Sequence, residues 1–113
     1  MGDDLKIGLE EALTLLRAAG EPTRLRLLAL LSRGDLTVKD LTTILGQSQP
    51  RISRHLKLLC EAGLIERHPE GAWAYYRIGG GADGHAAMRA LLALLDPEDA
   101  VVDRDRERAD EVK

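Results

Sequence analysis

Apolar residues recur three and four positions apart along the first half of the chain, which is the spacing of one helix face. They predict four successive amphipathic helices, over about residues 5–19, 22–33, 38–45 and from 49 to near 63. Glycine or proline stands at the boundaries between these stretches, as expected of short helices that are joined by tight turns. The first half of the chain is therefore predicted to be helical.

The third and fourth predicted helices are separated by a short turn that contains Gly46. Thr37 and Asp40 have the spacing of a capping box at the start of the third helix. Ser48 can cap the fourth helix, and Pro50 fits its first turn, where the missing N–H is not needed. A short helix, a tight turn and a second helix with polar, cationic first turns form the helix-turn-helix pattern, in which the second helix enters the DNA major groove.

The polar side of the fourth helix carries most of the residues that we expect to contact DNA. Arginine pairs well with guanine and glutamine with adenine at base edges, whereas other cationic side chains meet phosphates. We expect base contacts from the first turns of the helix and phosphate contacts from its end and from the following segment. The predicted DNA-binding residues are Ser48, Gln49, Arg51, Ser53, Arg54, His55, Lys57, Arg67 and Arg77.

After Gly63 the apolar spacing changes to every second residue, the period of a β-strand. The stretch LIERHPEGAWAYYRI holds two strand-like runs around a Pro-Glu-Gly turn, so that Ala74, Tyr76 and Ile78 share one face. This pattern predicts a β-hairpin, or wing. A glycine-rich break and a fifth helix that ends at Pro97 follow.

The predicted fold is mainly α with a β-hairpin wing, a dimeric winged helix-turn-helix domain over residues 1–97. We expect residues 98–113 to form a charged, solvated C-terminal tail or the start of a linker, with a short helix as the alternative.

Two apolar stripes, one in the first helix and one in the fifth, are not needed to close a helix-turn-helix core. On so small a domain these helices would cover each other in a two-fold dimer, which matches two DNA half-sites about one turn apart. Packing within a single domain is the alternative. The predicted dimer interface consists of Leu5, Leu9, Leu13, Leu16, Met88, Leu91, Leu92 and Leu95.

Composition narrows the class of protein. A chain of 113 residues has room for one domain and little room for an enclosed catalytic pocket. A single cysteine excludes an internal disulfide, no apolar stretch approaches twenty residues, and the acidic start is unlike a signal peptide. His55 and His68 have no evident nucleophile or orienting acid beside them. We therefore expect a cytoplasmic protein that has no membrane partner and is not an enzyme.

The net charge of −3 becomes compatible with DNA once it is mapped along the chain. Residues 22–77 hold nine Lys or Arg against five Asp or Glu, a local charge of +4 that leaves −7 on the flanks. A basic middle can place positive potential on one face, although a solvated mixed surface is the alternative.

The segment EPTRLRLLALLSRGDLTVKDLTTILGQSQPRISRHLKLLCEAGLIERHPEGAWAYYRI resembles the ArsR-type winged-helix transcriptional regulators, with a similarity that covers roughly residues 10–95. Its strongest elements are Pro22-Thr23-Arg24, Leu45-Gly46 before Ser48-Gln49, Ser53 with His55-Leu56, and Ala62-Gly63-Leu64. Its second half, RHLKLLCEAGLIERHPEGAWAYYRI, is most similar to the regulator segment that precedes S-adenosylmethionine-dependent methyltransferase domains in some bacterial proteins.

The resemblance implies a homodimer built from the first and last helices that binds a double-stranded, inverted-repeat operator. It also implies a repressor that is released by an effector, which could be a small molecule such as S-adenosylmethionine or S-adenosylhomocysteine. The alternative function is a regulatory or dimerisation module of a larger methyltransferase polypeptide.

The family's metal sites are poorly matched. Where the best-known members carry a thiolate pair, this chain reads DLTVKDL, with Thr37 and Lys39 at the ligand positions, and a lysine cation would repel a divalent metal. A second family site is matched in part by Asp83, His85, Asp96 and Asp99. The alternative is that Asp83 caps a helix and the others are solvated. We expect no required cofactor.

Overall fold

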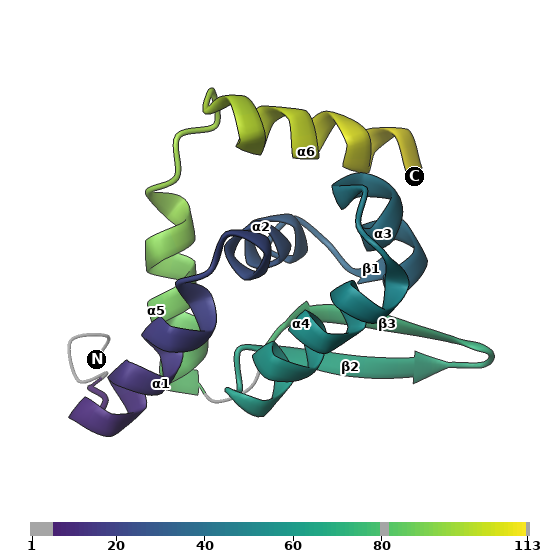
Figure 1. Ribbon diagram of the computed structural model, residues 1–113. Helices are drawn as coiled ribbons and strands as arrows, with labels where there is room; N and C mark the ends of the chain where they lie inside the picture. The colour runs from purple at the N-terminus through teal and green to yellow at the C-terminus, as the bar shows by residue number, and fades with distance from the viewer. Residues whose placement is uncertain (1–5, 80–81, 113) are drawn as a thin grey trace.

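The computed structural model describes residues 6–79 and 82–112, with the side chains of 82–85 left out of the description. Figure 1 shows α2 near the centre of the molecule, with α6 crossing above it and the hairpin below. The elements in chain order are α1 (Leu9–Ala19), α2 (Pro22–Leu31), β1 (Leu36–Thr37), α3 (Val38–Leu45), α4 (Gln49–Glu61), β2 (Ile65–Glu70), β3 (Trp73–Ile78), α5 (Ala82–Ala93) and α6 (Ala100–Val112).

The helix-turn-helix unit forms where the sequence predicts it. At the start of α3, the Thr37 hydroxyl accepts the Asp40 N–H, and the Asp40 carboxylate accepts the Thr37 N–H, which completes the capping box. Gly46 ends the helix in the left-handed region, with a φ of 67°, where a residue without a Cβ is favoured. Ser48 then caps α4, and Pro50 occupies its first turn.

The wing is a three-stranded antiparallel sheet with the strand order β1-β3-β2. Tyr76 and Ile78 are buried at its base, as the period of two predicts. The predicted Pro-Glu-Gly turn is wrong, because Pro69 and Glu70 pair with β3. The turn is instead formed by Gly71 and Ala72, and the φ of 63° at Gly71 suits a residue without a Cβ. The short strand β1 was not predicted, since two residues carry no periodic signal.

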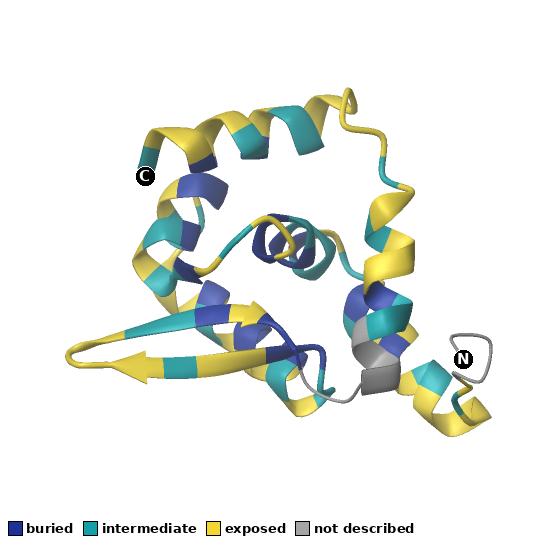
Figure 2. Ribbon diagram, turned by 180° about the vertical axis from the view of Figure 1, so that it is seen from behind, coloured by how far each residue is buried: buried dark blue, intermediate teal, exposed yellow. Residues whose placement is uncertain are grey.

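The core gathers the apolar faces of α2, α3 and α4 against the base of the wing. Figure 2 shows buried positions on these elements and an exposed outer end of the hairpin. Burial of the leucines and isoleucines is the main source of stability, at about 1.5–3 kcal/mol for each large apolar side chain. The largest fully buried side chains are Leu27, Leu28, Leu36, Leu41, Ile44, Ile52, Leu56, Leu59 and Leu64.

The C-terminal segment is not a solvated tail but a helix, the alternative that the sequence left open. It forms α6, a helix of 13 residues that packs on α2 and α3. Asp105 is only 3% exposed, and its carboxylate accepts two hydrogen bonds from Arg26, from Nε at 2.8 Å and from Nη2 at 2.9 Å. Arg108 donates to the backbone oxygen of Ile44 at the end of α3. The alternating charges of this segment do not indicate which few residues anchor it to α2 and α3.

None of the helices in residues 6–79 and 82–112 is both long and apolar enough to cross a membrane.

Candidate DNA-binding surface

The outer face of α4 carries the polar residues that the sequence assigns to DNA contact. Gln49, Arg51, Arg54 and Lys57 are exposed, because Ile52, Leu56 and Leu59 turn the opposite face into the core. Ser53 is half-buried, and its hydroxyl accepts a hydrogen bond of 2.7 Å from the Gln49 amide. A helix that is anchored on one side and cationic on the other can present its side chains to base edges without rearranging the core.

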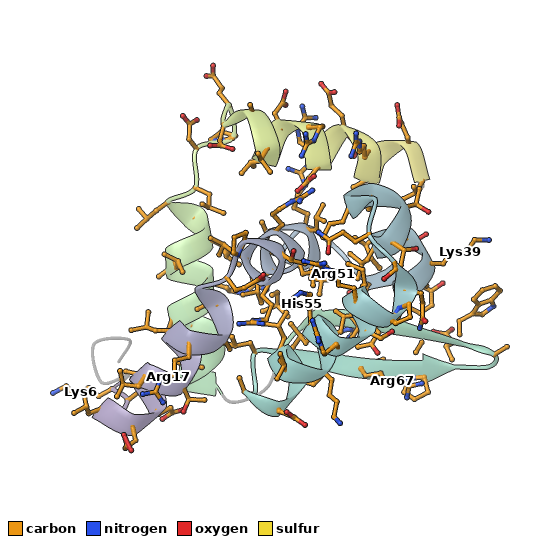
Figure 3. All side chains as sticks on the ribbon, in the orientation of Figure 1. Lys6, Arg17, Lys39, Arg51, His55 and Arg67 are labelled. Atoms are coloured by element: carbon orange, nitrogen blue, oxygen red, sulfur yellow. The ribbon has the colours of Figure 1, made fainter. Side chains whose placement is uncertain are left out.

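The wing and α3 extend this surface into a hollow of about 310 Å³. Gln49 and Ser53 of α4 line it together with Arg67 of β2, so the structure brings three predicted residues together. Lys39 of α3 and Trp73 of β3 also line it, and neither was predicted. Figure 3 shows Lys39, Arg51 and Arg67 extending from three different elements.

Lys39 and Trp73 could have been identified from their places in the sequence. Lys39 is an exposed cation in the first turn of the helix that precedes α4, and Trp73 is a largely exposed tryptophan just beyond the hairpin turn. A large exposed aromatic side chain beside two cations is suited to contact with a polyanion's sugars and phosphates.

Arg77, predicted to contact phosphate, lies near the base of the wing rather than at its tip. Its Nη2 donates to the Asp35 carboxylate at 2.6 Å, and both side chains are exposed. Exposed pairs of this kind are worth only about 0–1 kcal/mol. Arg77 can therefore exchange Asp35 for a phosphate at little cost.

His55 is the member of the predicted set that the structure removes from direct DNA contact. It is only 5% exposed, because its position on α4 turns it toward α2 rather than outward. Its Nδ1 accepts a hydrogen bond of 3.2 Å from Arg24 Nη1. Arg24 also donates to the carbonyl oxygens of Ala18 and Arg17. His55 therefore joins α4 to the end of α1 through Arg24.

Burial of His55 lowers its pKa below the ordinary value of 6.5; the negative charge of Glu21 opposes this in part, and the positive charges of Arg24, Arg54 and Arg51 lower the pKa further. Its Nε2 is buried and has no hydrogen-bond partner in the described residues. The neutral ring is therefore favoured in the folded protein.

We expect the free energy of unfolding to decrease as the pH falls between about 7 and 5, because the unfolded chain then binds a proton at residue 55 that the folded chain resists. Urea unfolding of the wild type and of a His55→Gln variant at several pH values measures this. The His68→Gln variant is the control, since the His68 side chain is 43% exposed and contacts Glu66. Equal pH dependence in all three proteins would show that His55 does not carry the effect.

The predicted dimer residues differ in their exposure. Leu9, Leu16 and Leu91 leave apolar surface exposed on α1 and α5, and Leu94, which was not predicted, is 83% exposed just after α5. Leu13, Leu92 and Leu95 are half-buried. The assignment of Met88 to the interface is wrong, because at 3% exposure Met88 belongs to the core and cannot face a partner. Leu5 lies outside the described residues.

The four residues that match the second family metal site in part are Asp83, His85, Asp96 and Asp99. Asp96 and Asp99 each accept hydrogen bonds from nearby backbone N–H groups in the turn that leads into α6. The side chains of Asp83 and His85 lie outside the described part of the chain. Among the described side chains, no group of three or more His, Cys, Asp or Glu could hold a metal ion.

The family of bacterial regulatory proteins described as the arsR family matches residues 21–67, which span α2 through the start of β2. The arsenical resistance operon repressor of Escherichia coli is 49% identical over 65 residues, covering 57% of this chain and 56% of the relative. The transcriptional repressor SdpR of Bacillus subtilis is 39% identical over 62 residues, covering 55% of this chain and 69% of the relative. The chain thus spans little more than half the length of the first relative.

A solved structure has the same arrangement. The homodimeric winged helix-turn-helix DNA-binding domain of Mb0332 from Mycobacterium bovis superposes with a TM-score of 0.68 at 29% identity, covering 79% of this chain and 82% of that one. This likeness agrees with the predicted winged helix-turn-helix fold.

Proposed function

The chain belongs to the arsR family of bacterial regulatory proteins, and we propose that it is a sequence-specific DNA-binding transcriptional regulator. It acts as a repressor that binds an inverted-repeat operator as a homodimer and leaves it when an effector binds. The named relatives from Escherichia coli and Bacillus subtilis are repressors, which supports the direction of control.

The observation that carries this proposal is the two-sided character of α4. One face is fixed in the core by Ile52, Leu56 and Leu59, while the other presents Gln49 and Arg51 to solvent. Base-edge recognition needs this combination, because a side chain that reads a base must be held within hydrogen-bonding distance by a rigid support. The hollow beside Arg67 and Lys39 supplies the adjoining cationic surface for phosphates.

Exposed leucines on α1 and α5 support the dimer. Leu9 and Leu94 are 78% and 83% exposed, and Leu16 is 61% exposed. Exposed apolar surface of this kind can be covered by a second protein chain. A second copy covers them and places a second α4 on the DNA.

The alternative of a methyltransferase module gains no support from the Escherichia coli, Bacillus subtilis and Mycobacterium bovis proteins, which carry regulator or DNA-binding names. An adenosyl compound as the effector is still a prediction from the sequence.

The salt dependence of DNA binding tests the proposal. A Lys57→Ala variant is expected to bind specific and random DNA more weakly, because the exposed Lys57 neutralises a phosphate and releases counterions. The slope of log affinity against log salt should flatten by about 0.9 for each phosphate that the variant no longer neutralises. Fluorescence anisotropy with DNA from the chain's own promoter measures this.

Lys6→Ala is the matched control, since Lys6 is exposed but precedes α1 and lies off the predicted surface. Its slope should equal that of the wild type. A wild-type protein that binds no DNA at low salt would contradict the function, whereas an unchanged slope for Lys57→Ala would remove only that contact.

A further inference from the structure

A second and larger hollow, of about 450 Å³, lies between α2 and α6 and takes in the turn that joins α5 to α6. Figure 1 shows α6 crossing α2 at this place. None of the residues that line it belongs to the predicted DNA-binding surface. Its volume is in the range of small-molecule sites, about 300–1,000 Å³.

The walls of this α2–α6 pocket are mainly apolar. Leu25, Ala29 and Leu30 form the α2 side, and Val101 and Val102 form the α6 side. The polar residues of its lining are all Arg or Asp. An occupant needs an apolar body where it lies against the leucine, alanine and valine side chains, because polar groups placed there would lose their hydrogen bonds to water without replacement.

The charged groups around the pocket differ in what they already bind. Asp105 is neutralised by the two hydrogen bonds from Arg26. Asp96 and Asp99 accept backbone N–H groups of the turn. Arg33 and Arg104 line the pocket and are exposed, and their guanidinium groups have no hydrogen bond or ion pair within the described residues. Asp96 and Asp99 keep their negative charge but already accept backbone N–H groups, so the charged groups of the lining that are free to take a new partner are the guanidinium groups of Arg33 and Arg104.

We propose that the α2–α6 pocket binds a small hydrophobic carboxylate. Its apolar body lies against Leu25, Ala29 and Val102, and its carboxylate pairs with the guanidinium groups of Arg33 and Arg104. Guanidinium–carboxylate pairs are among the stronger polar contacts because two parallel hydrogen bonds can form. Adenosyl compounds fit less well, since their ribose hydroxyls and charged amino group would place polar atoms against the apolar walls.

The position of α6 gives such a ligand a physical link to the helix-turn-helix unit. The same helix that forms one wall donates from Arg108 to the Ile44 oxygen at the end of α3, at 3.1 Å. The binding proposal itself does not depend on the DNA-binding function, because it is tested on the protein without DNA.

Titration of the full chain with 2-naphthoate, followed by its fluorescence and by NMR, tests the pocket. Methyl 2-naphthoate is the uncharged probe of nearly the same shape, and S-adenosylhomocysteine is the adenosyl probe. We expect 2-naphthoate to bind at least about tenfold more tightly than either. The Arg33→Gln/Arg104→Gln double variant should lose that preference, whereas Arg17→Gln, an exposed arginine of α1 outside the lining, should keep it.

Two filling variants locate the site. Ala29→Trp and Val101→Trp each place a large ring in the pocket from a different helix and should abolish binding while the helical circular dichroism is retained. If one variant fails to fold, the other still decides. Absence of 2-naphthoate binding, equal binding of its methyl ester, tighter binding of S-adenosylhomocysteine, or binding that survives a folded filling variant would each overturn the proposal.

Discussion

A Leu94→Glu variant is expected to be monomeric and to bind its operator about 10²-fold more weakly or worse, since a monomer loses the avidity of two linked recognition helices. Leu94 is 83% exposed in the single chain and lies just after α5, where its backbone N–H donates to the Leu91 oxygen. A carboxylate there costs little in the monomer. In a packed apolar interface it would be desolvated without a partner, which costs several kcal/mol.

Sedimentation equilibrium and operator titration on the same samples measure both effects. Leu58→Glu is the matched control for mass, because Leu58 is an exposed leucine of α4, outside α1 and α5. It should remain dimeric. A Leu94→Glu protein that stays dimeric and binds normally would show that the dimer uses another surface.

An Asp105→Ala variant is expected to lower the free energy of unfolding by on the order of 3 kcal/mol, because it leaves the guanidinium of Arg26 partly buried without its partner. The Arg26 side chain is 22% exposed and the Asp105 side chain is 5% exposed, and the pair joins α6 to α2. The hydrogen bond to Asp105 raises the pKa of Arg26, and the arginine stays charged without that bond because a guanidinium is protonated at any physiological pH.

Urea unfolding at fixed protein concentration measures the loss. Asp110→Ala removes a surface contact with Arg106 and should cost less than about 1 kcal/mol. The double variant Arg26→Met/Asp105→Leu should recover much of the stability, since apolar replacements can match a buried pair. If Asp105→Ala and Asp110→Ala unfold alike, α6 is not anchored by this pair.

The features predicted correctly from the sequence are those that local rules govern. The Thr37–Asp40 capping box, the left-handed Gly46 and the start of α4 depend on residues within a few positions of each other. The exposed and buried faces of α4 follow from helical periodicity alone. For the same reason, most of the predicted base-reading residues are exposed on one face.

The features that were missed depend on contacts between distant segments. His55 has the polarity of a surface residue, yet it is buried against Arg24, 31 positions away. Asp105 lies in a segment with the composition of a solvated tail, and its partner is 79 positions away. Met88 repeats with the exposed leucines of α5 but points into the core. No local pattern distinguishes these residues, because tertiary packing decides their burial.

The most direct test of sequence reading by α4 is the selection of duplexes from a randomised DNA pool. Wild-type and Arg51→Ala proteins are used in parallel. We predict that wild type enriches an inverted repeat whose half-sites are centred about 10 base pairs apart, or a multiple of that distance. Arg51→Ala should lose preference at one or two positions in each half-site, at a cost of about 1–3 kcal/mol per contact. No enriched repeat, or the same repeat with both proteins, would contradict the assignment of base reading to Arg51 and the outer face of α4.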